Sequence, residues 1–334
     1  LFIIPPGKDA TKPEWLSPWQ LLSGQPLTEK NRAYLDTLQQ LVSAIYVGDS
    51  VAAKIAIDTF KAQVGVTRAM ALEVRFNRAN WFNYSMFLYL LACFSVLLGF
   101  QFKHKAFWIC SFLFLIVGCG MHSTGIIQRM IIMQRPPVTT LYESILFVGW
   151  AVVILATFVE FFMRNGVALF VASIAGASLN MLSKQYALDG DTMGMLVAVL
   201  NSNFWLGTHV VSITFGYGCT LLVGIFAHAY LFLRVFKPSD KLLLNNTYKN
   251  TVGLTFIALF FTTLGTILGG IWGDQSWGRF WGWDPKENGA LLIVMWLLMM
   301  LHLKISGWVK GPGYALGLVL VNITVALAWF GVNL

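Results

Sequence analysis

The sequence has few charged residues, which make up 11% of its 334 positions, against 57% hydrophobic residues. Its mean hydropathy of +0.67 is too high for an ordinary soluble domain and indicates a membrane protein with several spans. Acidic residues are scarcer than basic ones, 15 against 23, but the resulting charge of +8 forms no basic stripe. We therefore expect no nucleic-acid partner.

Cysteine is also scarce, and its placement argues against a metal site or a redox pair. All four cysteines lie within apolar stretches, where we interpret them as small core residues: Cys93, Cys110, Cys119 and Cys219. The sequence lacks an initial methionine and a signal peptide, and its last residues lie within an apolar run. We therefore expect it to be part of a longer protein.

Eight apolar stretches each come near the roughly 20 residues that a helix needs to cross a bilayer. They lie at about 82–101, 106–127, 144–163, 166–183, 204–234, 251–271, 288–303 and 313–334. Residues 1–80 have mixed charges and helical periodicity but no run long enough to span. The sequence thus predicts an all-α polytopic membrane bundle, 81–334, of about eight transmembrane helices, preceded by an extramembrane helical region, 1–80.

The short connections between these spans predict how the bundle is oriented. One set holds nine Lys and Arg residues and lies at 102–105, 164–165, 234–250 and 304–311. The other set holds five and lies at 128–143, 184–203 and 272–287. Because cytoplasmic connections carry the excess of Lys and Arg, the second set and the 1–80 region are expected on the outer face.

One predicted outer connection, 272–288, is rich in tryptophan and glycine and reads WGDQSWGRFWGWDPKEN. A tryptophan that anchors a helix at the headgroups usually occurs singly. Four within twelve residues indicate a platform for a large flat ligand, and the glycines let the backbone come close to it: Trp272, Trp277, Trp281 and Trp283.

Five histidines were considered as ligands of that platform. His209 opens the fifth span at the predicted depth of the tryptophans, and an imidazole beside a water-poor aromatic surface suits an iron porphyrin. His228 lies about 28 Å further along the same helix and is expected at the opposite interface. His104 is expected to be solvated. His122 fits a hydrogen bond to a neighbouring helix better than a ligand role, and His302 lies near the inner end of the seventh span.

The segment SWGRFWGWDPKE resembles the tryptophan-rich "WWD" signature of the heme-handling proteins of cytochrome c biogenesis. Its last four residues, Asp284-Pro285-Lys286-Glu287, are similar to the corresponding segment of the System II cytochrome c synthases, of the CcsA and fused CcsBA type. The resemblance extends over about 82–334 and includes Asn203-Phe204-Trp205-Leu206 with His209, Arg135-Pro136-Pro137, Leu141-Tyr142-Glu143-Ser144, and Leu301-His302-Leu303-Lys304.

This resemblance implies that the protein carries heme b to the outer face of the plasma (inner) membrane. There it would attach heme to the CxxCH motif of apocytochrome c, as a holocytochrome c synthase of the lyase type. His209 would be the external axial ligand and His302 the transmembrane one. The resemblance assigns the heme platform to Trp272, Trp277, Gly278, Trp281, Trp283 and Asp284. Arg279 and Lys286 are candidates for contacts with the heme propionates, and an ordinary positively charged loop residue is the equal alternative for each.

The sequence departs from the family pattern after Glu287, where Asn288-Gly289 replaces a frequent Thr-Trp pair. The family's second external histidine is expected beyond Leu334, and His122 is the substitute ligand that this sequence offers. The partner of His302 is expected in a ResB/CcsB-like half that precedes Leu1, either fused or separate.

Three alternatives remain open from the sequence. An electron-transfer cytochrome b would hold heme permanently, usually between paired histidines on two helices at two depths. A transporter could use the aromatic residues as a gate, or could carry heme without synthase activity. A non-catalytic scaffold for apocytochrome is the third.

Overall fold

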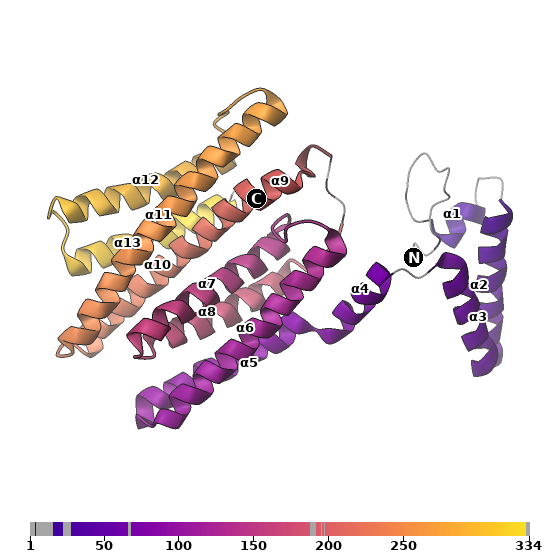
Figure 1. The fold of residues 1–334 in the computed structure, drawn as a ribbon, viewed down its shortest axis with the longest axis horizontal. Helices are drawn as coiled ribbons and strands as arrows, with labels where there is room; N and C mark the ends of the chain where they lie inside the picture. The colour runs from indigo at the N-terminus through magenta and orange to yellow at the C-terminus, as the bar shows by residue number, and fades with distance from the viewer. Residues whose placement is uncertain are drawn as a thin grey trace. The chain divides into compact units, whose positions relative to one another are not determined.

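The computed structural model describes residues 4, 16–22, 28–65, 68–187, 192–194, 196 and 198–331. Within them the chain is helical apart from its connections and one isolated bridge between Ile4 and Leu16, so the predicted all-α class is confirmed. The chain divides into two compact units, Leu1–Arg75 and Phe76–Leu334 (Figure 1). The division falls within helix α4 (Arg68–Ala79), a little before the boundary predicted at residue 80.

The first unit is built around a helical hairpin. Its helices are α1 (Pro18–Leu22), α2 (Glu29–Val47), α3 (Ser50–Val64) and the start of α4. Gly48 takes a left-handed conformation that ends α2, and the Asp49 carboxylate then accepts two amides of the first turn of α3. Helices α2 and α3 pack together, and the Tyr34 hydroxyl donates to the Gln63 carbonyl at 3.2 Å.

The second unit is a bundle of long apolar helices. They are α5 (Trp81–Phe102), α6 (Lys105–Met133), α7 (Leu141–Met163), α8 (Val167–Gln185), α10 (Val211–Phe236), α11 (Lys241–Trp277), α12 (Pro285–Ile305) and α13 (Gly311–Trp329). Among the described residues, eight helices are long and apolar enough to cross a membrane, the first of them running from Met70 to Phe102. The protein is therefore a multi-pass membrane protein, as predicted.

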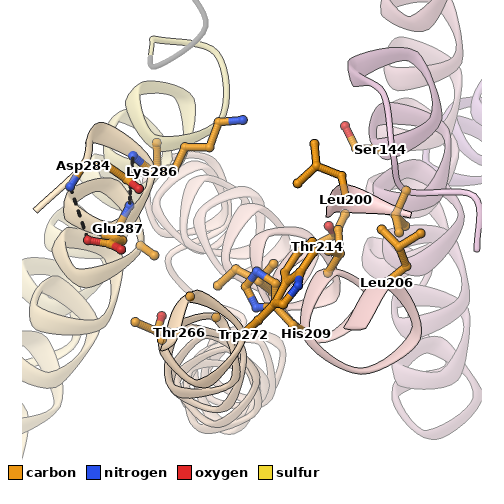
Figure 2. A pocket seen from close by; sticks show the side chains of 18 of the residues that line it. Ser144, Leu200, Leu206, His209, Thr214, Thr266, Trp272, Asp284, Lys286 and Glu287 are labelled. Atoms are coloured by element: carbon orange, nitrogen blue, oxygen red, sulfur yellow. Dashed lines mark hydrogen bonds between the residues drawn. The ribbon is translucent and has the colours of Figure 1, made fainter. Parts of the chain in front are cut away.

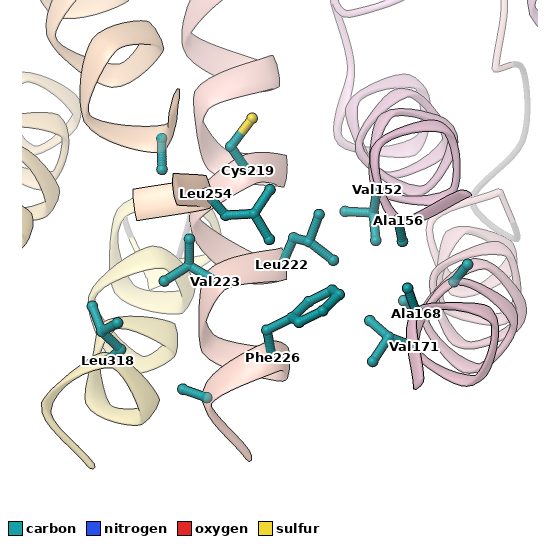
Figure 3. Close-up of a cluster of buried hydrophobic side chains, with 14 of the residues drawn as sticks. Val152, Ala156, Ala168, Val171, Cys219, Leu222, Val223, Phe226, Leu254 and Leu318 are labelled. Carbon is teal, nitrogen blue, oxygen red and sulfur yellow. The ribbon is translucent and has the colours of Figure 1, made fainter. Parts of the chain in front are cut away.

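Helix α10 lies at the centre of this bundle, where it contacts α7, α11 and α13. Figure 3 shows Leu222 and Phe226 of α10 facing small and branched side chains of α7 and α8, including Val152, Ala156, Ala168 and Val171. Because lipid tails are as apolar as these side chains, close packing holds the helices together more than exclusion from water does.

Two glycines bring α10 and α11 into backbone contact. A Cβ atom at Gly265 would lie 2.7 Å from the Ile213 Cα, and one at Gly216 would lie 2.8 Å from the Thr262 nitrogen. A larger residue at either position would force the helices apart. The crossing thus fixes α11 against the first turns of α10, directly after His209.

The tryptophan-rich loop is shorter than the sequence predicted. Helix α11 continues through Trp272 to Trp277, and the connection to α12 is Gly278–Asp284 rather than residues 272–288. A helical glycine such as Gly273 costs only about 1 kcal/mol, which the burial of the Trp272 ring outweighs. The helix ends where Gly278 takes a left-handed conformation, with φ of 69°.

Candidate functional site

A cavity of about 480 Å³ lies at one end of the second unit. Its walls come from the start of α7, the residues around Leu196 and Leu200, the start of α10, the end of α11, the start of α12 and the end of α13. The cavity thus joins the three connections that the sequence predicted on one face, 128–143, 184–203 and 272–287. Its size falls within the range of small-molecule sites, about 300 to 1,000 Å³.

His209 lines this cavity from a π-helical turn, Leu206–Val210 (η2), which precedes α10. The imidazole Nδ1 lies 2.8 Å from the Gly265 carbonyl oxygen. Since a carbonyl can only accept, Nδ1 carries the proton and Nε2 keeps the lone pair that a metal ligand needs. Gly269 makes room for the ring, because a Cβ there would lie 2.6 Å from the His209 Cε1.

A row of indole rings stands beside His209. The Trp272 ring lies 5.7 Å from the imidazole and 6.4 Å from the nearly parallel ring of Trp205. Trp277 adds a third ring, 6.1 Å from Trp272. The Trp205 indole nitrogen donates to the Gln275 side chain at 3.2 Å, which ties the segment before His209 to α11. The row offers a large aromatic surface next to one free imidazole nitrogen.

The predicted platform residues do not all meet at the cavity. Trp272, Trp277, Trp281 and Asp284 line it, whereas Gly278 and Trp283 do not. Trp283 has a left-handed backbone, with φ of 58°, and its side chain is 69% exposed. Its ring contacts Trp281 edge to face at 6.0 Å, so it adjoins the site through that neighbour.

The start of α12 is held by a capping box. The Asp284 carboxylate accepts the amides of Lys286 and Glu287, and the Glu287 carboxylate accepts those of Gly282 and Asp284. Arg279 lies 3.8 Å from Glu287. Figure 2 shows Asp284, Lys286 and Glu287 on one side of the cavity and Leu200, Leu206 and Ser144 on the other, with His209 and Trp272 between them. The Asp284 carboxylate is therefore used to hold backbone amides. The cations Arg279 and Lys286 lie on the same wall of the cavity.

His122 is not brought to this cavity. It is fully buried in α6, where its Nδ1 lies 3.2 Å from the Tyr89 hydroxyl and its ring meets the Phe82 ring at 5.5 Å. The interhelical hydrogen bond agrees with the interpretation that the sequence favoured. His122 therefore does not line the cavity that His209 lines.

The other histidines lie away from the cavity. His302 is exposed on α12, and its Nδ1 lies 2.8 Å from the Leu298 carbonyl of the same helix. His228 is likewise exposed, with its Nδ1 2.8 Å from the Gly224 carbonyl, and His104 caps the start of α6. Within the described part of the chain, no three or more His, Cys, Asp or Glu residues form a group that could hold a bare metal ion.

Two tryptophans of the site were not predicted to belong to it. Trp205 stacks on the Trp272 ring. Trp329 lines the cavity, and its indole nitrogen donates to the Ser144 hydroxyl at 3.0 Å. Trp329 looks like an ordinary interfacial tryptophan near the end of the last span. The available signal was its predicted depth, which is the depth of the tryptophan-rich loop.

The part of the chain that forms the cavity is similar to known proteins. Residues 138–334, which include every described wall of the cavity, match the family model of the cytochrome C assembly protein. The chain is 28% identical to the cytochrome c biogenesis protein CcsA of Prochlorococcus marinus over 281 residues, 74% of this chain and 89% of that protein. It is 28% identical to CcsA of Trieres chinensis over 253 residues, 62% of this chain and 77% of the relative.

A third relative is much longer than this chain. Protein NrfI of Wolinella succinogenes is 30% identical over 223 residues, which cover 64% of this chain but only 24% of NrfI. The chain thus spans about a quarter of NrfI and most of each CcsA protein. The family model covers more than half of the chain and contains the cavity. The chain therefore belongs to the cytochrome C assembly protein family and is a multi-pass membrane protein of cytochrome c biogenesis.

Proposed function

We propose that this protein is a holocytochrome c synthase that binds heme b in the cavity beside His209. It attaches the heme through thioether bonds to the CxxCH motif of apocytochrome c. The observation that carries the proposal is the fixed imidazole of His209, whose Nδ1 is bonded to Gly265 and whose Nε2 is free for a metal.

The residues present fit a heme. An iron porphyrin needs an axial nitrogen, apolar and stacking contacts for its flat face, and cations for its two propionates. His209 supplies the nitrogen, and the rings of Trp272, Trp277 and Trp281 supply the contacts. Arg279, which lies 3.8 Å from the Glu287 carboxylate, and Lys286 are the two cations that line the cavity and could meet the propionates. A bare transition-metal ion would instead require several protein ligands.

The work of the protein is to position the reactants and exclude water. His209 orients the macrocycle, and its hydrogen bond to Gly265 keeps the imidazole in one tautomer and one rotation. Asp284 orders the start of α12, so that Lys286 and Arg279 stay on the same wall. Bound heme supplies the vinyl groups to which the two cysteine thiols of the CxxCH motif add.

We further propose that His302 holds heme before it reaches this cavity. Its side chain is exposed on the bundle, with Nδ1 bonded within its own helix and Nε2 left to act as a ligand. A second ligand would then come from a ResB/CcsB-like half that packs against α12. The distribution of Lys and Arg supports an orientation with the cavity on the outer face of the membrane, which we propose is the inner (plasma) membrane.

Replacing His209 by glycine tests the proposal. We expect the purified variant to lose most of its heme and to regain the wild-type absorption spectrum when imidazole is added. His228→Gly is the matched control, because His228 lies on the same long helix, is exposed and is remote from the cavity. Unchanged heme content and spectrum in His209→Gly would show that the ligand assignment is wrong.

A second measurement separates a synthase from its alternatives. Thioether formation on a co-expressed CxxCH apocytochrome is measured in a host that lacks its own maturation pathway. We expect covalent heme with wild type and a loss of it with His209→Gly. Heme binding without thioether formation would favour a heme transporter or a b-type cytochrome.

A further inference from the structure

A buried ion pair lies next to the wall of the cavity that is formed by residues 138–141. Arg129 of α6 and Glu143 in the first turn of α7 are each 2% exposed, and their side chains meet at 2.8 Å. The heme contacts proposed above use neither residue, and neither lines the cavity.

Arg129 connects α6 to a segment far along the chain. Its guanidinium donates to the Thr192 carbonyl at 2.6 Å and to the Thr192 hydroxyl at 3.2 Å. The same group lies 5.0 Å from the centre of the Tyr142 ring, which adds a cation–π contact. Leu196, four residues beyond Thr192, lines the cavity. Arg129 thus holds Thr192, which lies shortly before the lining residue Leu196 in the chain.

Glu143 divides its two oxygens between the ion pair and the cavity wall. One oxygen accepts from Arg129, and the other accepts the amide of Thr139 at 3.0 Å and its hydroxyl at 2.5 Å. Thr139 itself lines the cavity, as do its neighbours from Val138 to Leu141. The carboxylate therefore fixes the backbone of the wall directly.

A buried ion pair is a costly way to stabilise a protein. Removing two charges from water often costs more than their attraction returns, and apolar residues of similar volume are frequently as stable. What apolar residues cannot supply here is the pair of hydrogen bonds to Thr139 or the pair to Thr192. Glu143 thus contacts a residue of the wall, Thr139, and Arg129 contacts Thr192, four residues before the lining residue Leu196.

We propose that Arg129 and Glu143 are positioning residues that hold this wall at the distance from His209 that heme binding requires. The inference rests on the proposed function, because it concerns the same cavity. The pair acts through the main chain of Thr139 and Thr192 and does not touch the heme. Its removal should therefore weaken heme binding even where the bundle keeps its stability.

The test compares four variants of the full chain purified in detergent. Glu143→Gln removes the negative charge of the pair, and Arg129→Met removes the guanidinium. The double variant Arg129→Met/Glu143→Leu replaces the pair with apolar side chains. Glu160→Gln is the matched control: Glu160 is also buried on α7, but at its other end, where it accepts the amides of Gly166, Ala168 and Leu169. Each protein is titrated with heme, melted, and examined by hydrogen exchange over residues 136–146 without heme.

We expect heme affinity to fall roughly 10- to 100-fold in Glu143→Gln and Arg129→Met, because a binding group displaced by about 1 Å can cost about 100-fold even when the substitution is distant. The Thr139 amide should exchange faster in the same variants. The double variant should melt near the wild-type temperature yet keep the weak heme binding and the fast exchange. Glu160→Gln should melt earlier with unchanged heme affinity.

Two results would overturn the proposal. One is recovery of heme affinity together with melting temperature in the double variant, and the other is an equal loss of heme affinity in Glu160→Gln. Either would mean that the pair contributes stability alone. Failure of the wild-type protein to bind heme would instead refute the proposed function, while hydrogen exchange would still report whether the pair holds the wall.

Discussion

The fit between Gly269 and the imidazole of His209 gives a direct test of the ligand geometry. In Gly269→Ala the new Cβ would lie 2.6 Å from the His209 Cε1 and 3.1 Å from its Nδ1. Ordinary contacts between carbon atoms begin near about 3.5 Å, so the ring must move by about 1 Å. A shift of that size breaks the 2.8 Å hydrogen bond between Nδ1 and the Gly265 carbonyl.

This substitution has two opposing effects on stability. Overpacking costs about 1 to 3 kcal/mol, and alanine gains about 1 kcal/mol over glycine within a helix. We therefore expect a net loss of no more than about 2 kcal/mol. Heme affinity should fall roughly 10- to 100-fold, as it does when the group that orients a metal ligand is lost. That ratio equals about 1.4 to 2.8 kcal/mol of binding free energy.

Heme titration followed by absorbance, together with thermal unfolding of the heme-free protein, measures both quantities. Gly253→Ala is the control, since Gly253 lies on the same helix and a Cβ there would meet no atom within 4 Å. It should bind heme as the wild type does. Equal heme affinity in Gly269→Ala and Gly253→Ala would refute the assignment of His209 as an oriented axial ligand.

Three further predictions concern the capping box of α12, Gly166 at the start of α8, and Lys286 in the cavity wall. Asp284→Ala removes the capping box of α12 and should cost about 1 kcal/mol, seen as a lower melting temperature. Gly166→Ala should destabilise the bundle strongly without changing its heme affinity, because Gly166 has φ of 78° and its Cβ would overlap the Trp108 ring; unimpaired melting would contradict the packing described. Lys286 is exposed, so Lys286→Gln should weaken heme binding by no more than about fivefold, and the difference should shrink at high salt. A salt-independent loss would point to a different role.

The spans could be predicted from sequence because the bilayer imposes a length and a composition on each helix. All eight predicted stretches overlap a candidate span of the structure, with ends that differ by several residues. The ends were less predictable because helices continue past the apolar core wherever side chains still pack. Trp272 is the example, since its burial carries α11 beyond the glycines that suggested a loop.

The site was predictable where its residues share a predicted depth in the membrane. His209 and Trp272 are 63 positions apart, yet equal depth was enough to expect them together, and their rings lie 5.7 Å apart. Depth says nothing about which face of a helix a residue occupies. For that reason His122 was a candidate ligand, although its ring contacts Tyr89 of α5. The hydrogen bond between His209 and the Gly265 carbonyl was not predicted, because it depends on how α10 and α11 cross.

The backbone contact between α10 and α11 also constrains how heme can reach the cavity. Gly216 and Gly265 bring the two helices together within two turns of His209, with Thr262 and Ile213 on the opposing surfaces. A rigid macrocycle cannot pass through a seam in which even a methyl group would collide with main-chain atoms. Heme that moves from His302 to the cavity, as proposed above, would therefore not pass between α10 and α11.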